Sequence, residues 1–176
     1  MDTRPKATPW YDWKEWKMVF RLLYNENPKE QWKGISIVNA WRVRVSSLPI
    51  AVDSTAQMLE LLFQIENMKP LSQQESESTI WTTHRSSQEL RLAASLSIIR
   101  MVNGLVDKEQ KNEFARSVNS LAQSLNLPKW LVDIRHKSTH NELPSLDSLK
   151  VAIQLSLSWL YENYWLVFFL LLIQSA

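Results

Sequence analysis

Large apolar residues recur every three or four positions along most of this chain, which is the spacing of one face of an α-helix. The segment near the C-terminus shows the pattern clearly, with Leu149, Ile153, Leu157 and Leu160 in succession. Alternating strand-like patterns are few, and only two of the 176 residues are glycine. The sequence therefore predicts an all-α fold in one domain, and its 45% hydrophobic residues are enough to form a core.

Composition removes several functional classes. The chain has no cysteine, so neither a disulfide nor a catalytic thiol is possible. The first nine residues lack the apolar core of a secretory signal, which favours synthesis on free ribosomes. The net charge is only +2, and such a balance gives no general attraction to nucleic acid. Any contact with RNA must therefore come from local clusters of basic side chains.

Capping residues and prolines set the expected helix boundaries. The first helix is expected to begin at Pro9, with Thr8 as its cap. The apolar stripe of this helix, which we interpret as core, consists of Trp10, Trp13, Trp16, Phe20 and Leu23. The pair Ser86 and Glu89 predicts another helix start. The later helices are expected at about 28–45, 48–68, 88–106, 107–125, 128–140 and 146–164.

A polar tract at 69–87 interrupts this helical pattern. It is rich in Ser, Thr and Gln and contains His84. Neither flanking half is expected to fold alone, so we interpret the tract as a surface loop inside one domain. His84 is then a loop histidine.

A segment at 130–144 carries the strongest functional signal. It holds two of the three histidines, His136 and His140, with Arg135 directly before them. Pro128 favours a helix start, and each residue of a helix from Pro128 to His140 advances by about 100°. Arg135, His136 and His140 then lie at roughly 0°, 100° and 140°, so one arc of the helix carries all three.

These three groups are the parts needed to cleave RNA without a metal ion. One imidazole can remove the proton of a ribose 2′-hydroxyl, and the other can protonate the departing 5′-oxygen. The Arg135 guanidinium can stabilise the charge that builds on the phosphate. We therefore assign Arg135, His136 and His140 as catalytic candidates, leave open which histidine is the acid, and expect no cofactor.

Further basic residues are candidates for RNA contacts. Lys129 lies at the start of the motif's helix, and Lys137 lies within the motif. Arg100 and Asn103 are polar residues in an otherwise apolar helix, where they need partners. Three roles are open for these two residues: they orient the Arg135 helix, they contact phosphate, or they are simply exposed at the helix rim. We include Lys129, Lys137 and Arg100 as RNA-binding candidates.

The motif resembles a known signature. Arg-polar-x-x-x-His, here 135–140, is similar to the motif of HEPN ribonucleases, all-helical domains that pair so that two motifs meet at the dimer seam. The longer string 127–146 resembles one HEPN branch, the Las-one family of endoribonucleases that act in pre-ribosomal RNA processing. Segments at 9–16, 98–107 and 159–165 resemble the same family, so the resemblance covers most of the chain.

The resemblance implies a HEPN-type helical bundle at 1–165 that forms a symmetric homodimer, followed by a divergent apolar tail at 166–176. It implies a role in ribosome biogenesis in the nucleus and nucleolus. The implied substrate is precursor ribosomal RNA, cut in internal transcribed spacer 2 to leave 2′,3′-cyclic phosphate and 5′-hydroxyl ends. The family's partner is a polynucleotide 5′-kinase, but the C-terminal part that holds the kinase is expected to be absent here.

Other interpretations of the same residues remain. Two histidines four residues apart also suit zinc, although His84 is the only further histidine and zinc needs three or four ligands. An Arg-His pair can also simply form salt bridges, with Asp133 and Glu142 as partners. A catalytically impaired short form would act as a dimerising or scaffold module in ribosome assembly.

The apolar run Tyr164 to Ile173 has ten residues, whereas a bilayer needs about twenty. Extending the run backwards meets Glu162 and Asn163, which are unfavourable in lipid. We therefore expect no membrane contact, and we expect the run to continue the final helix.

Overall fold

The computed structural model describes residues 8–67, 86–110, 117–140 and 143–174. These residues contain helices and no strand, which confirms the predicted all-α class for this part of the chain. The elements are α1 (Trp13–Leu23), α2 (Pro28–Arg44), α3 (Ile50–Glu66), α5 (Ser87–Glu109), α6 (Val118–Ser124), α7 (Lys129–Thr139), α8 (Leu146–Leu160), the short π-helix η1 (Tyr161–Trp165) and α9 (Leu166–Gln174).

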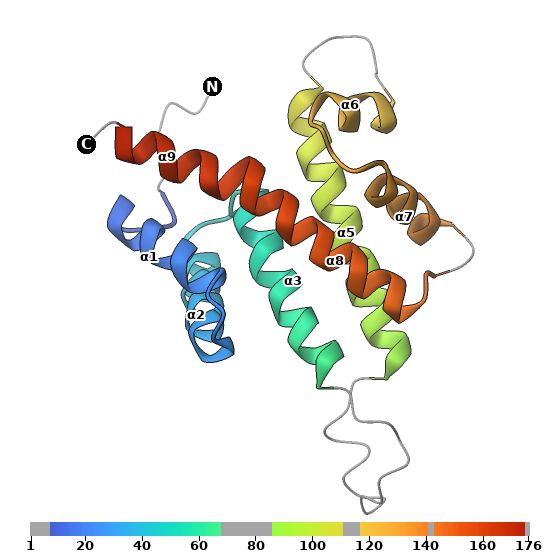
Figure 1. Cartoon of the computed structure of the whole chain (residues 1–176), viewed down its shortest axis with the longest axis horizontal. Helices are drawn as coiled ribbons and strands as arrows, with labels where there is room; N and C mark the ends of the chain where they lie inside the picture. The colour runs from blue at the N-terminus through green and yellow to red at the C-terminus, as the bar shows by residue number, and fades with distance from the viewer. Residues whose placement is uncertain (1–7, 68–85, 111–116, 141–142, 175–176) are drawn as a thin grey trace, which may run out of the picture.

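The central element is α5, which packs against α3, α6, α7 and α8. Figure 1 shows α1 and α2 on one side of this centre and α6 and α7 on the other, with the continuous rod of α8, η1 and α9 crossing between them. The helix that carries the predicted motif, α7, thus lies beside the central helix of the bundle.

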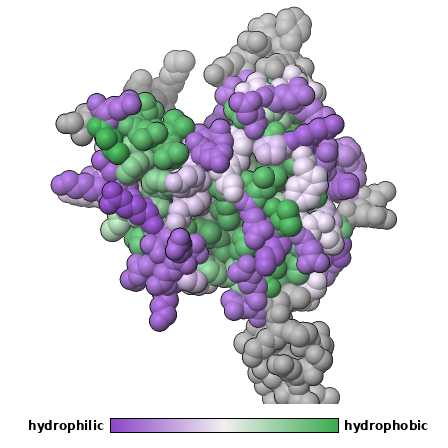
Figure 2. Space-filling view, viewed as in Figure 1, coloured by the Kyte–Doolittle hydropathy of each residue, from purple (hydrophilic) through white to green (hydrophobic). Residues whose placement is uncertain are grey.

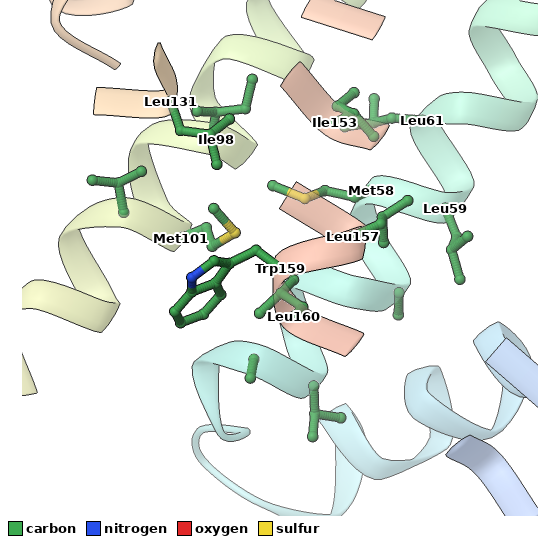
Figure 3. Packing of buried hydrophobic residues seen from close by; sticks show 14 of the residues in the cluster. Met58, Leu59, Leu61, Ile98, Met101, Leu131, Ile153, Leu157, Trp159 and Leu160 are labelled. Atoms are coloured by element: carbon green, nitrogen blue, oxygen red, sulfur yellow. The ribbon is translucent and has the colours of Figure 1, made fainter. Parts of the chain in front are cut away.

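The core forms where α3, α5, α7 and α8 meet (Figure 3). Its fully buried side chains include one or more from each of these helices: Met58, Ile98, Met101, Leu131, Ile153 and Leu160. Burying an aliphatic side chain of this size contributes about 1.5–3 kcal/mol. Since Leu131 is part of this core, the inner face of α7 is fixed and its outer face is defined.

A second group of buried rings joins the first helix to the last. Trp165 of η1 stacks on Trp16 and Phe20 of α1, with ring centroids 4.9 Å and 5.6 Å apart. The Trp165 indole N–H also donates to Thr55 Oγ1 of α3 at 2.9 Å. The predicted core role is confirmed for Trp10, Trp16, Phe20 and Leu23. It is wrong for Trp13, which is 43% exposed.

Two predicted helix starts are also wrong. Asp12, rather than Thr8, caps α1 by accepting from Glu15 N, and the helix begins at Trp13 instead of Pro9. The Thr8 hydroxyl donates to Trp10 O instead. The sequence predicts the start of a fifth helix at about 107, but α5 continues to Glu109.

The segment that follows α5 has its own start. In the described residues α6 begins at Val118, where Ser117 accepts from Ser120 N. Capping by Ser86 and Glu89 is confirmed as a reciprocal capping box. Most of the 69–87 tract, with His84, lies outside the described residues.

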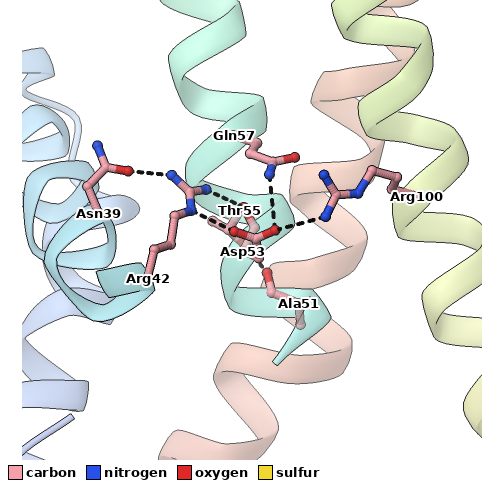
Figure 4. Close-up of polar contacts among 7 residues, drawn as sticks. All are labelled: Asn39, Arg42, Ala51, Asp53, Thr55, Gln57 and Arg100. Atoms are coloured by element: carbon pink, nitrogen blue, oxygen red, sulfur yellow. Dashed lines mark hydrogen bonds and ion pairs between the residues drawn. The ribbon is translucent and has the colours of Figure 1, made fainter. Parts of the chain in front are cut away.

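A largely buried carboxylate connects three helices (Figure 4). Asp53 of α3 accepts from Arg42 Nε of α2 at 2.7 Å and from Gln57 Nε2 at 3.0 Å. Arg100 of α5 reaches the other side of the carboxylate at 3.8 Å. Since α2, α3 and α5 each supply a group, this cluster sets their relative positions.

Gly104 allows α5 and α3 to approach closely. A Cβ atom at this position would lie 2.7 Å from Ile50 Cγ1, which is shorter than any normal contact. The next residue back along α5 is Asn103, so the same close packing fixes the part of α5 that faces the motif.

The final helix changes character along its length. Leu146–Gln174 is the segment, in the part of the chain described, that is long and apolar enough to cross a membrane by length and composition, a test that core helices of soluble proteins also pass. Its α8 part is core, with Leu149 and Ile153 fully buried. Figure 2 shows apolar surface gathered over α9. The exposed apolar side chains there are Val167, Phe168, Leu170, Leu171 and Ile173.

Candidate functional site

The motif helix α7 is amphipathic. Leu131, Val132 and Ile134 are buried against the bundle, which leaves the opposite side of α7 facing solvent. Pro128 occupies the N-cap rather than the predicted first helical position. The helix ends at Thr139, and His140 is the C-cap with an extended backbone (φ −111°, ψ −169°) whose N–H donates to Lys137 O at 3.1 Å.

The two histidines lie together on the solvent side. Both imidazoles are exposed, and their ring centroids are 4.4 Å apart with an interplanar angle of 57°. The extended backbone at His140 does not separate them, although the helix was expected to include this residue. Two groups that can exchange protons are thus adjacent and accessible to a substrate.

Arg135 is held differently from the histidines. Its side chain is half-buried, and its Nε donates to Asn103 Oδ1 of α5 at 3.0 Å. Among the described residues, which include Asp133 but not Glu142, no carboxylate pairs with this guanidinium, and its two terminal amino groups make no hydrogen bond. A planar cation, held at Nε, therefore lies on the same helix as the imidazole pair.

A second tether from α5 was not predicted. Arg91 Nε donates to Pro144 O at 2.9 Å, and its Nη2 donates to Leu143 O. These carbonyls lie just past the motif, where Pro144 breaks the helical pattern and leaves backbone acceptors in need of donors. That need is visible in the sequence, but the choice of Arg91, more than fifty residues away, is not.

The RNA-binding candidates separate into two places. Lys129 and Lys137 are both exposed on α7, and they lie eight residues apart, so their side chains point about 80° apart around the helix. Arg100 instead extends toward Asp53, with its side chain 56% exposed. The structure thus places Lys129 and Lys137 with the motif, whereas the partner of Arg100 belongs to α3.

An apolar stripe on α5 leads to the motif. Leu92 and Leu96 are 51% and 55% exposed, and Ile99 is half-buried. These residues and Asn103 follow one another at spacings of four, three and four, so they form one line along the helix. This stripe therefore ends at the residue that holds Arg135.

No group of three or more His, Cys, Asp or Glu side chains is placed to hold a metal ion in the described residues. His84, the third histidine considered for a zinc site, lies outside them. Among the described residues the site contains two imidazoles, one held guanidinium and the two lysines of α7.

Comparison with known proteins identifies the family. The model of the Las1-like family matches residues 8–167, which include α1 to α8 and the whole motif. The chain belongs to the Las1-like family. The resemblance to the Las-one family is thereby confirmed.

Three relatives of this Las1-like chain illustrate the match. It is 34% identical to "Protein LAS1" of Saccharomyces cerevisiae over 167 residues and 34% identical to "Pre-rRNA-processing protein las1" of Schizosaccharomyces pombe over 166 residues. It is 28% identical to "Ribosomal biogenesis protein LAS1L" of Mus musculus over 157 residues. The alignments cover 92%, 91% and 89% of this chain, but only 31%, 31% and 18% of the relatives. The chain therefore spans less than a third of the length of each.

Proposed function

We propose that this Las1-like domain is a metal-independent endoribonuclease of the HEPN type that acts on precursor ribosomal RNA. The observation that carries the proposal is the exposed pair of imidazoles, with ring centroids 4.4 Å apart, on the same helix as the Arg135 guanidinium, whose Nε is held by Asn103. An acid, a base and an anion-stabilising group are sufficient for this reaction because RNA supplies its own nucleophile.

The reaction is a transesterification. One of His136 and His140 removes the proton from O2′, which then bonds to phosphorus. The bond between phosphorus and O5′ breaks, and the other imidazole donates a proton to O5′. Arg135 donates to the non-bridging oxygens, where negative charge builds. The products are a 2′,3′-cyclic phosphate and a 5′-hydroxyl.

The substrate assignment is supported by the relatives. The fission yeast relative is named for pre-rRNA processing and the mouse relative for ribosome biogenesis. We assign precursor ribosomal RNA as the substrate, internal transcribed spacer 2 as the cleaved region, and the nucleus and nucleolus as the location. A polynucleotide 5′-kinase is the partner that the resemblance implies for the family, and the expected 5′-hydroxyl product is the substrate of such an enzyme, but the part that holds the kinase is not among these residues.

A second copy of the chain completes the proposed site. Two α7 helices that face each other would supply four imidazoles and two guanidinium groups to one symmetric cleft. The exposed stripe of Leu92 and Leu96 supports pairing next to the motif, because apolar side chains at this spacing favour packing against another helix.

The test is cleavage of a labelled spacer RNA in EDTA by the parent chain and by His140→Ala. The parent is expected to cut and His140→Ala to lose cleavage by a factor of about 100 or more. His84→Ala is the matched control, since it makes the same change outside the motif. Cleavage that survives in His140→Ala, or that EDTA abolishes in the parent, contradicts the proposal. Binding of RNA without cleavage by the parent favours a scaffold role.

A further inference from the structure

The contact between Asn103 and Arg135 joins the central helix to the motif. Asn103 is a half-buried polar residue on α5, and Figure 1 shows α7 lying beside this helix. Its partner atom is Arg135 Nε, at 3.0 Å from Oδ1. Because Nε can only donate, the asparagine must present its oxygen, and the amide orientation is fixed by the contact.

The choice of Nε matters for what Arg135 can bind. A hydrogen bond at Nε holds the plane of the guanidinium and restricts rotation of the long side chain. The two terminal amino groups, which make no hydrogen bond among the described residues, then form a fork that two oxygens of one phosphate can accept. Asn103 therefore orders the cation without occupying the donors that a phosphate needs.

The chemical type of residue 103 is also informative. A carboxylate at this position would hold Arg135 more strongly, but it would neutralise the positive charge. The amide of Asn103 accepts the same hydrogen bond and carries no charge. The contact therefore preserves the electrostatic attraction of Arg135 for an anion.

We infer that Asn103 is a positioning residue that orients the Arg135 guanidinium toward the phosphate of bound RNA. This inference rests on the proposed nuclease function. It assigns to α5 a direct part in the site, since the helix supports the motif through a polar contact as well as through packing.

The first test separates orientation from charge. Asn103→Ala removes the acceptor, and cleavage is expected to fall about 10–100-fold in kcat with a smaller change in KM, because a loosely held cation is misplaced mainly in the transition state. The Arg135 Nε–H signal in the NMR spectrum should broaden. Asn103→Asp should keep that signal, because the acceptor remains, but should weaken RNA binding, because the cation is neutralised. Asn67→Ala is the control, since the Asn67 amide donates to Phe63 O of its own helix.

The second test asks whether Asn103 acts through Arg135. Affinity is measured for an RNA with a 2′-deoxy sugar at the cleavage site, in the parent, Asn103→Ala, Arg135→Ala and the double variant. Asn103→Ala is expected to weaken binding in the parent and to have no further effect in Arg135→Ala.

The results distinguish this inference from the nuclease proposal. Cleavage that depends on His140 and is unchanged in Asn103→Ala overturns the positioning role alone, as does an equal loss of affinity in both Arg135 backgrounds. A parent chain that neither cuts nor binds RNA overturns both. Equal melting temperatures of the parent and Asn103→Ala show that unfolding does not cause the loss.

Discussion

At the scale of single residues, the site combines one held group with two accessible ones. Arg135 is half-buried and bonded to Asn103, whereas His136 and His140 are exposed and adjacent. Proton transfer requires imidazoles that a substrate can reach, and charge stabilisation requires a cation that is already oriented. The different burial of the three side chains fits these different roles.

The orientation of Arg135 gives a prediction for a conservative change. Arg135→Lys keeps the charge but has neither the planar fork nor an Nε donor in the same place. Cleavage is expected to fall about 100-fold or more in single-turnover assays, with an unchanged melting temperature. Arg44→Lys makes the same change at an exposed position of α2 and should cleave normally. A parent-like rate for Arg135→Lys would mean that charge alone is needed.

The basic residues are distinguished by the salt dependence of RNA binding. Lys129→Gln and Lys137→Gln are each expected to reduce the slope of log affinity against log salt by about one, because each removes an exposed positive charge beside the motif. Arg100→Gln should leave the slope unchanged, since this guanidinium already faces Asp53. A reduced slope for Arg100→Gln would show that Arg100 contacts RNA as well.

Much of the motif geometry could be predicted from sequence. Helical periodicity placed His136 beside His140, and the rule that polar groups on apolar helices need partners indicated a role for Asn103. The tether by Arg91 could not be predicted, because it depends on how α5 and the chain after α7 lie in space. Local spacing thus predicts neighbours within a helix, whereas contacts between distant segments require the packed fold.

At the scale of helices, the same distinction explains the boundaries. The start of α5 was predicted correctly because Ser86 and Glu89 cap each other within four residues. The start of α1 was wrong because Thr8 and Asp12 are both good caps. Asp12 caps α1 in the structure, while the Thr8 hydroxyl is bonded to Trp10 O. The capping preference alone does not decide between two such residues.

The exposed stripe on α5 predicts how dimer formation can be disrupted. Leu92→Glu combined with Leu96→Glu should convert the proposed dimer to a monomer, because two charges would be buried in the apolar contact. Both side chains are about half exposed, so the monomer should remain folded. Sedimentation measures the change, and cleavage should fall with it. Val151→Glu, at a 52% exposed position of α8, is the matched control. A double variant with the sedimentation of the parent would place the interface elsewhere.

At the scale of the whole molecule, contacts between its first and last helices hold the two ends of the described chain together. Trp165 stacks on Trp16 and Phe20, and its indole bonds Thr55, so one side chain joins η1, α1 and α3. Tyr24 extends the contact by donating to Leu157 O, and burial raises the pKa of its phenol. Burial likewise raises the pKa of Tyr164 to about 12, so both phenols stay protonated at physiological pH.

This closure predicts which tryptophan matters most for stability. Trp165→Ala is expected to lower the free energy of unfolding by about 3–5 kcal/mol in urea titrations, because it empties a fully buried site and removes two stacking contacts. Trp165→Phe should lose less, since a ring remains to stack. Trp32→Ala is the control: this ring stacks on Phe63 but is 42% exposed, so its loss leaves no closed cavity. Equal losses for Trp165→Ala and Trp32→Ala would show that η1 adds little to the core. In that case the stability of the bundle would come mainly from α3, α5, α7 and α8. The site on α7 would then not depend on the packing of α1 against η1.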